Sequence, residues 1–365
     1  MIEIVISLIM SVGFLSNDLS EDEHIIFYPA YGYEDAGEWV IPMRIYVYEY
    51  RPGTLQTVTR FVRRIQNLTE EQRQIFSERA RDFVVDSESR KIVQFVFDGD
   101  PEEEIFGIKD DDGEFLRSSR NGIIEGDIRI PKERMEQIIE NSENGDGWLT
   151  IRAVNDYHEA TGSVQLIPNQ GLSVISDIDD TIKITEIPAG AQIVVRNTFF
   201  KEFTPATEIT ELYETFGDAA FHYVSGSPWQ LFRPLAEFAF SEDVGFPEGT
   251  LHMKSVTKNF LSVSTWRDLR ELALNEDYTY DQKIEQISEI FEHFPERRFI
   301  LSGDSGERDP EVFNRIRELY PDQVEKIYIR DVVNDREMRP ERLEGMVIIP
   351  APTVVRGESQ FEWEN

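Results

Sequence analysis

The chain has 365 residues, a formal net charge of −33 and no cysteine. This length is sufficient for two domains, and an apolar fraction of 40% with 24 Phe and 13 Tyr indicates a folded protein. The acidity argues against a nucleic-acid partner, and the lack of cysteine excludes disulfides, thiolate nucleophiles and cysteine-bound zinc.

The first 20 residues begin MIEIVISLIMSVGFLSND and fit two alternatives. Ser11 and Gly13 are small residues near a cleavage point of the kind that ends a signal peptide. Glu3, and the lack of Lys or Arg before the apolar stretch, argue instead for a first strand or a disordered start. The first alternative implies an exported or periplasmic protein and the second a cytoplasmic one. No later stretch is long and apolar enough to cross a bilayer.

Residues 25–168 are predicted to form a mostly β, sandwich-like domain with a helical insertion. The runs IIFYPAYGY and EWVIPMRIYVYEY are rich in aromatic and β-branched residues, which is typical of strands. Residues 54–84 have helical spacing instead, and Thr69 with Gln72 resembles a capping box at a helix start. Strand patterns return from IVQFVFDGD to GWLTIRAVN.

Residues 170–355 are predicted to form a second, α/β domain, followed by an acidic tail at 356–365. Strand patterns such as LSVISDI, AAFHYVSG and RRFILSGD alternate with helix patterns such as SPWQLFRPLAEFAF. A helix is expected to begin at Lys283, since an apolar face follows it at Ile284, Ile287, Ile290, Phe291 and Phe294. Alternation with short connections predicts a mostly parallel sheet with helices on both faces.

An acidic stretch, SDIDDTIKIT, ends the first strand of this second domain. Alternate residues of an extended chain face the same way, so Asp177 and Asp179 share one side while Ile178 turns to the core. Carboxylates gathered in this way repel one another, which favours a bound cation. An EF-hand loop does not fit, because Ile182 and Pro188 stand where it requires Gly and Glu.

Other polar groups follow the neighbouring strands of the predicted sheet. FHYV leads to Ser225 and Gly226, RFILSG leads to Asp304, and Lys283 begins the helix before that last strand. Ligands of open α/β sheets bind beyond the carboxyl ends of the strands, so these groups are expected to meet Asp177 there. Lys254 and Lys258 are rivals of Lys283 for the same role.

The residue types suit Mg²⁺-assisted transfer of a phosphoryl group. Oxygen ligands without His or Cys favour Mg²⁺, with Asp177 and Asp304 as ligands. Asp177 is also the expected nucleophile on phosphorus. Asp179 belongs to the metal site with its side chain kept off the ion, where it would protonate the leaving oxygen and later activate water. Ser225 and Lys283 would bind the phosphoryl oxygens.

DIDDT matches the D-x-D-x-T signature of the haloacid dehalogenase superfamily, and Ser225, Lys283 and GDSGERD match its second, third and fourth motifs. Over residues 145–355, strings such as YVSGSPW and FPERRFILSGDSGERDPEVF resemble more narrowly the catalytic domain of the actin-patch-type phosphatidate phosphatases. The resemblance implies a haloacid-dehalogenase-like (Rossmannoid) sheet and a Mg²⁺-dependent phosphatase, with Asp177 as nucleophile and Asp179 as acid and base. FYPAYGY matches loosely the β domain that bacterial members carry.

Several neighbours of these motifs have expected roles that stay open. Thr181 and Asp309 are expected to support the site, although Glu307 competes with Asp309 as the carboxylate beside the metal. Asp180 is expected at a helix start or behind the ligands. Ser227, before a proline, is expected to cap a helix. The remaining basic candidates for substrate contact, each more typical of a surface charge, are Lys183, Arg308 and Arg330.

Three functions are consistent with the sequence. The first is dephosphorylation of phosphatidate to diacylglycerol through an aspartyl-phosphate. The second is a phosphatase for a soluble or protein-bound phosphomonoester, and the third a non-catalytic Mg²⁺-binding module. About 45 residues separate the first two motifs, too few for a large lid, so the site should be open to a bulky substrate. A net charge of −33 opposes docking on an anionic membrane and leaves at most peripheral contact.

Overall fold

The computed structural model describes residues 19–50, 53, 68–142, 147–155, 157, 159–255 and 276–355, without the side chains of 276–278. Lys258, the first 18 residues and the tail from 356 lie outside this description, as do the expectations for them. The contacts divide the chain into two units. One comprises Met1–Tyr28, Ala36–Tyr50 and Asp86–Val164, and the other Pro29–Asp35, Arg51–Val85 and Gln165–Asn365.

The first unit is mostly β, as predicted. The eight-stranded sheet has the order β1-β3-β2-β8-β7-β5, with β4 and β6 pairing β3. Antiparallel ladders join β3 to β1, β4 and β6, and β5 to β7. Its elements are β1 (Glu23–Phe27), β2 (Ala30–Asp35), β3 (Glu38–Glu49), β4 (Asp86–Ser87), β5 (Phe95–Phe97), β6 (Ile123–Pro131), α4 (Lys132–Asn141), β7 (Trp148–Ala153) and β8 (Thr161–Leu166). The residues of β2 group with the second unit.

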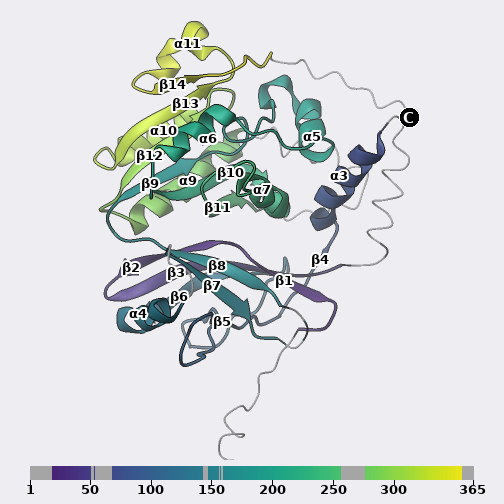
Figure 1. The fold of residues 1–365 in the computed structure, drawn as a ribbon, viewed down its shortest axis with the longest axis vertical. Coiled ribbons are helices and arrows are strands. Elements are labelled where there is room, and N and C mark those ends of the chain that lie inside the picture. Colours follow the sequence, from purple (N-terminus) through teal and green to yellow (C-terminus); the bar gives the residue numbers. More distant parts are fainter. Residues whose placement is uncertain are drawn as a thin grey trace, which may run out of the picture. The chain divides into compact units, whose positions relative to one another are not determined.

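The second unit contains a six-stranded sheet in the order β11-β10-β9-β12-β13-β14 (Figure 1). The strands are β9 (Leu172–Ser176), β10 (Ala220–Pro228), β11 (Gly249–Lys254), β12 (Arg298–Asp304), β13 (Val324–Asp331) and β14 (Val347–Pro350). All five neighbouring pairs are parallel, which confirms the predicted parallel sheet. β9 is central, so the strands ending at Asp304 and Ser225 flank the one that precedes Asp177.

Helices cover both faces of this sheet. Successive residues of β9 enter separate cores: Val174 packs with Ile209 of α6 and Leu235 of α7, whereas Ile175 packs with residues of α9 and α10. This alternation follows from the two-residue period of a strand and makes both faces apolar. The helices are α3 (Glu70–Ala80), α5 (Ala191–Phe199), α6 (Thr207–Glu214), α7 (Phe232–Ala239), α9 (Glu276–His293), α10 (Asp309–Leu319) and α11 (Asp335–Met338), with short 3₁₀ helices η1 (Arg81–Phe83), η2 (Ile187–Ala189), η3 (Trp229–Leu231) and η4 (Pro340–Leu343).

The helical segment predicted as an insertion of the β domain groups instead with the second unit. Its capping box forms as expected, because Gln72 N donates to Thr69 Oγ1 at 3.2 Å and Thr69 N to Gln72 Oε1 at 3.0 Å. Phe76 and Phe83 are buried in the same core as Val174. Helical spacing shows that such residues share a face, but it does not show which core receives that face.

The helix expected to begin at Lys283 begins seven residues earlier, at Glu276. Its apolar face is as predicted, since Ile287, Ile290 and Phe294 are all 0% exposed. Among the helices of the described ranges, none is long and apolar enough to cross a membrane.

Replacing Ile290 by Ala should lower the free energy of unfolding by about 2–5 kcal/mol, because a fully buried side chain leaves a cavity in the core of the second unit. Leu319→Ala is the control, since Leu319 is 42% exposed and its truncation should cost no more than about 0.5 kcal/mol. Urea unfolding followed by circular dichroism measures both. Equal losses in the two variants would contradict the packing described here.

Candidate active site

Asp177 lies directly after the central strand and is held on both carboxylate oxygens. Its backbone N–H donates to Ser302 O of β12 at 2.9 Å, which continues the ladder one residue past β9. Oδ2 accepts a hydrogen bond from Thr181 Oγ1 at 2.9 Å, and Oδ1 accepts one from Lys283 Nζ at 2.8 Å. The residue is only 2% exposed. The structure therefore brings together three of the residues singled out in the sequence.

Asp180 shapes the turn that follows. Its φ of 57° lies in the left-handed region, which Asp tolerates better than most residues. Its carboxylate accepts backbone hydrogen bonds from Thr185 and Glu186 on Oδ1, at 2.9 and 2.7 Å, and from Ile187 on Oδ2, at 2.6 Å. Both carboxylate oxygens thus bind the backbone of its own loop, as expected for a residue behind the ligands.

Asp179 meets hydroxyl groups from two segments. Oδ2 accepts hydrogen bonds from Ser227 Oγ at 2.8 Å and from Ser225 Oγ at 3.4 Å, both on β10. Oδ1 accepts one from Thr185 Oγ1 at 2.7 Å and pairs with Lys183 Nζ at 2.6 Å. Burial by itself raises the pKa of Asp179, but the charge of Lys183 and these donors hold the net pKa below its usual range.

Three expectations near Asp179 are wrong. Lys183 is no surface charge, since it is 2% exposed and paired with Asp179. Ser227 is no helix cap, because β10 continues to Pro228 and no side chain caps the 3₁₀ helix after it. Arg330 is also buried, at 3% exposed, with contacts to Glu208 Oε1 at 2.7 Å and to the carbonyl of residue 180 at 3.0 Å.

Lys283 is the buried cation between three carboxylates. Its Nζ lies 2.8 Å from Asp177 Oδ1, 2.6 Å from Asp309 Oδ1 and 3.8 Å from Glu307 Oε2. Burial lowers the pKa of Lys283, yet the negative charges of Asp177 and Asp309 more than offset this and raise it well above its usual value. Lys283 lies inside α9 and not at its first residue, and its side chain reaches these acids from there.

Asp177, Asp304 and Glu307 form a compact group of carboxylates. Each offers one oxygen, and these oxygens all lie within 4.8 Å of one another. Asp304 Oδ1 accepts backbone hydrogen bonds from Gly306 at 2.6 Å and Glu307 at 3.2 Å. Asp304 Oδ2 is buried and has no hydrogen-bond partner among the described residues. Three hard oxygen donors with one unsatisfied oxygen fit a divalent cation such as Mg²⁺.

The pKa values in this group reflect the same crowding. Burial raises the pKa of Asp304 well above its usual range, and the charges of Asp309 and Glu307 raise it further. Burial likewise raises the pKa of Glu307, despite the opposing charge of Lys283. The pKa of Asp177 rises to about 7, because burial and the other acids outweigh Lys283. A positive ion would relieve all three effects.

Asp309 has a different position from Glu307. Its Oδ1 binds Lys283, and its Oδ2 accepts a hydrogen bond from Asp304 N at 3.1 Å. It thereby fixes both the lysine and the end of β12. A Cβ at Gly303 would lie 2.4 Å from Asp309 Oδ2, so only glycine leaves room for this contact. Of the two competing carboxylates, Glu307 joins the three-carboxylate group and Asp309 holds its neighbours in place.

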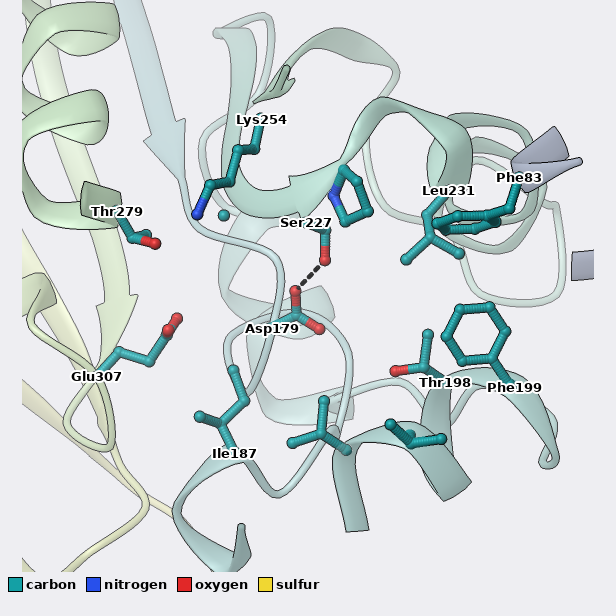
Figure 2. A pocket seen from close by; sticks show the side chains of 14 residues that line it. Phe83, Asp179, Ile187, Thr198, Phe199, Ser227, Leu231, Lys254, Thr279 and Glu307 are labelled. Atoms are coloured by element: carbon teal, nitrogen blue, oxygen red, sulfur yellow. Dashed lines mark hydrogen bonds between the residues drawn. The ribbon is translucent and has the colours of Figure 1, made fainter. Parts of the chain in front are cut away.

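A pocket opens at this end of the sheet (Figure 2). Its polar side contains Asp179 and Glu307 from the two acidic loops, together with Lys254 at the end of β11. Gly226 also lines it, and a Cβ there would lie 2.8 Å from Thr279 Cγ2. Lys254, the rival cation, is 4% exposed. Burial lowers its pKa, against the opposing charge of Glu307.

Lys283→Met should lower the free energy of unfolding by about 3–5 kcal/mol, because it leaves Asp177 and Asp309 buried without their cation. Lys326→Met is the matched control, since Lys326 is exposed on β13 and should change stability by no more than about 0.5 kcal/mol. Urea unfolding at neutral pH measures both variants. A cost below about 1 kcal/mol for Lys283→Met would show that the lysine does not balance these acids.

Comparison with known proteins gives matches to the second unit. Residues 172–331 match the family described as phosphatidate phosphatase APP1, catalytic domain. Phosphatidate phosphatase APP1 of Saccharomyces cerevisiae is 34% identical over 165 residues, or 44% of this chain and 26% of that protein. An uncharacterized protein of Schizosaccharomyces pombe is 26% identical over 178 residues, or 47% of this chain and 27% of that protein. The chain thus spans about a quarter of the length of either relative.

A solved structure of a carbohydrate esterase aligns with 84% of this chain and 88% of its own at 11% identity, but its TM-score of 0.21 is too low to indicate a shared fold. The family match, in contrast, includes Asp177, Asp179, Ser225, Lys283 and Asp304. Residues 172–331 are therefore similar to the catalytic domain of phosphatidate phosphatase APP1, and this similarity supports a phosphoric monoester hydrolase.

Proposed function

We propose that this protein is a Mg²⁺-dependent phosphatase of the haloacid dehalogenase type, which converts phosphatidate to diacylglycerol through an aspartyl-phosphate. One observation carries the proposal. Asp177, Asp304 and Glu307 converge within 4.8 Å, next to a buried lysine and to a second aspartate that is held by hydroxyl groups. This arrangement combines a cation site, a nucleophile and a proton carrier at the end of one strand.

The metal-binding part of the proposal assigns Mg²⁺ to Asp177 and Asp304, with Glu307 beside them. The unsatisfied Oδ2 of Asp304 supports this assignment, because a buried carboxylate oxygen without a partner is costly. When bound, Mg²⁺ would neutralise charge on the phosphoryl oxygens. The side chain of Asp179 stays off this group, because Lys183, Thr185 and the two serines of β10 hold it.

In the first step an oxygen of Asp177 attacks phosphorus. A P–O bond to aspartate forms, and the P–O bond to the leaving alcohol breaks. Each Asp177 oxygen accepts one hydrogen bond in the structure, from Thr181 or from Lys283, and keeps a second lone pair. Lys283 can therefore stay beside Asp177 and also bind a phosphoryl oxygen. Lys183 and the hydroxyl donors lower the pKa of Asp179, whereas the negative charge of a phosphoryl group bound beside it would raise that pKa. Asp179 would take up a proton with the substrate and pass it to the departing alkoxide, which leaves as the alcohol.

In the second step water attacks the aspartyl-phosphate. Asp179, now ionised, takes a proton from the water, the bond between phosphorus and Asp177 breaks, and inorganic phosphate is released. Gly226 of β10 lines the pocket, where its backbone N–H can hold a phosphoryl oxygen. Ser225 is fully buried beside it and donates its hydroxyl to Asp179, so a phosphate contact of Ser225 would need that hydroxyl to turn away from Asp179. Positioning and charge neutralisation supply most of the rate in such transfers.

The choice of phosphatidate rests on the similarity to phosphatidate phosphatase APP1 and on the character of the pocket. The pocket combines Asp179, Glu307 and Lys254 with apolar side chains, which suits a phosphate on an apolar alcohol. A soluble or protein-bound phosphomonoester is the second candidate, because a chain at −33 is repelled by an anionic membrane surface.

Purified protein should release phosphate from phosphatidate in detergent micelles when Mg²⁺ is present, and EDTA should abolish the release. Asp177→Asn should lower kcat by about 10⁴-fold or more, because the amide is a poor nucleophile. Arg317→Gln on α10 is a control, since Arg317 contacts the carbonyls of Glu344 and Gly345 and the side chain of Asn314, none of which belongs to the site. Full activity of Asp177→Asn would refute the mechanism, and activity on soluble esters alone would refute the lipid substrate.

Mg²⁺ binding has a readout that does not depend on turnover. Saturating Mg²⁺ should raise the Tm of the wild-type protein, because an ion that binds only the folded state stabilises it. Asp304→Asn removes one charge from the three-carboxylate group and should reduce this rise by at least half. Asp110→Asn, in an acidic turn of the first unit, should keep the whole rise. Equal rises in both variants would place the ion elsewhere.

A further inference from the structure

The pocket has an apolar half opposite the site. Figure 2 shows Phe83, Leu231 and Phe199 grouped on one side, and Lys254 and Glu307 on the other. The apolar half is built from three separate elements, η1, η3 and α5, and the residues at its edge come from η2 and from the end of β10. Its lining residues are Phe83, Ile187, Val194, Val195, Phe199, Pro228 and Leu231.

Phe83 reaches this pocket from far away in the sequence. It ends η1, about 90 residues before the first aspartate of the site and outside the segment that matches the catalytic-domain family. Its ring packs edge-on against Phe199, with a centroid distance of 5.5 Å and an interplanar angle of 64°. Phe83 is 7% exposed, so its ring is part of the core as well as of the pocket.

The segment that carries Phe83 is anchored firmly to the second unit. Arg79 of α3 donates to the carbonyls of Thr198 and Lys201 at 2.7 and 2.5 Å, at the C-terminal end of α5. Its guanidinium carbon lies 3.6 Å from the ring centroid of Phe203. Phe76 stacks on Phe200 at 5.0 Å. A charged group that caps helix carbonyls, together with a buried aromatic pair, fixes where the following 3₁₀ helix lies.

We infer that the apolar half binds the carbon skeleton next to the scissile phosphate of a lipid phosphate, and that Phe83 is a specificity-determining residue for it. The inference rests on the proposed function and names the part of the substrate that this wall recognises. The polar half of the pocket contains Asp179 and Glu307 of the proposed site, so the scissile phosphate is expected to lie in that half. An ester-linked acyl chain then begins within a few bonds of the phosphate, and apolar contact with Phe83 and Leu231 favours it over a bare polar alcohol.

The test compares two readouts that report the two halves of the pocket. The first is kcat/KM for dioctanoyl phosphatidate in detergent micelles. The second is the inhibition constant of inorganic phosphate, which occupies only the polar half. Phe83→Ala should lower kcat/KM for the lipid about ten-fold, because an aromatic contact with the substrate is lost. The inhibition constant of phosphate should change less than about two-fold.

Phe246→Ala is the matched control. Phe246 lies in the same core cluster and is 3% exposed, but it does not line the pocket and does not contact the segment that positions Phe83. Its truncation should lower the Tm to a similar extent and leave kcat/KM for phosphatidate per folded molecule within about two-fold of the wild type. Equal kcat/KM in Phe83→Ala and Phe246→Ala would overturn the inference. Absence of phosphatidate hydrolysis by the wild-type protein would instead overturn the proposed function.

A second variant keeps the test decisive if Phe83→Ala does not fold. Val194 of α5 lines the same half and is only half-buried. Val194→Thr keeps the shape of the side chain and adds one hydroxyl to the wall. It should lower kcat/KM for dioctanoyl phosphatidate about three-fold and leave the inhibition constant of phosphate as it is. An unchanged kcat/KM in this variant would show that the substrate does not contact the wall.

Discussion

The structure of the site depends on the repulsion between buried carboxylates and on the positive charge of Lys283, which opposes it. Asp177, Glu307 and Asp309 all face Lys283, while Asp304 completes the acidic group. One ammonium cannot neutralise four acids, and the raised pKa values of Asp177 and Asp304 express this shortfall. The protein tolerates the excess because parallel strands and short loops hold each acid in place.

This constraint also explains the polar groups that lie around the acids. The carboxylate of Asp180 accepts three backbone N–H groups, which partly offset its charge, although that charge still contributes to the raised pKa of Asp304. Lys183 offsets the charge of Asp179 with a salt bridge. Two aspartates two residues apart thereby acquire different surroundings. Asp177 lies among other acids and its pKa is raised, whereas Asp179 lies among a cation and hydroxyl groups and its pKa is lowered. The proposed roles of nucleophile and proton carrier need the reverse order, and a cation bound at Asp177 and a phosphoryl group bound beside Asp179 would both shift the pKa values in that direction.

The sequence predicts the second unit well, because the order of strands and helices and the spacing of residues within one strand can be read from neighbouring positions in the chain. Strand–helix alternation predicts the parallel sheet, and the two-residue period at Asp177 and Asp179 predicts one shared edge with Ser225 and Asp304. Lys283 was placed at the right site from motif order, although the helix begins earlier. The burial of Lys183 and Arg330 was not predictable, because a lone basic residue has no pattern that shows its partner. Phe83 was missed for the same reason, since its contacts come from residues more than 100 positions away.

The anchoring of α3 means that the second unit, which contains the candidate active site, is not a continuous piece of chain. A fragment cut to the family match, residues 172–331, would lack Arg79, Phe76 and Phe83. The carbonyls of Thr198 and Lys201 would lose their guanidinium donor, and Phe199 and Phe200 would face water. Exposed aromatic surface of this kind promotes self-association. The compact unit therefore extends beyond the segment that matches the family, because it also includes residues 51–85. These residues cover aromatic side chains of α5 that would otherwise be exposed.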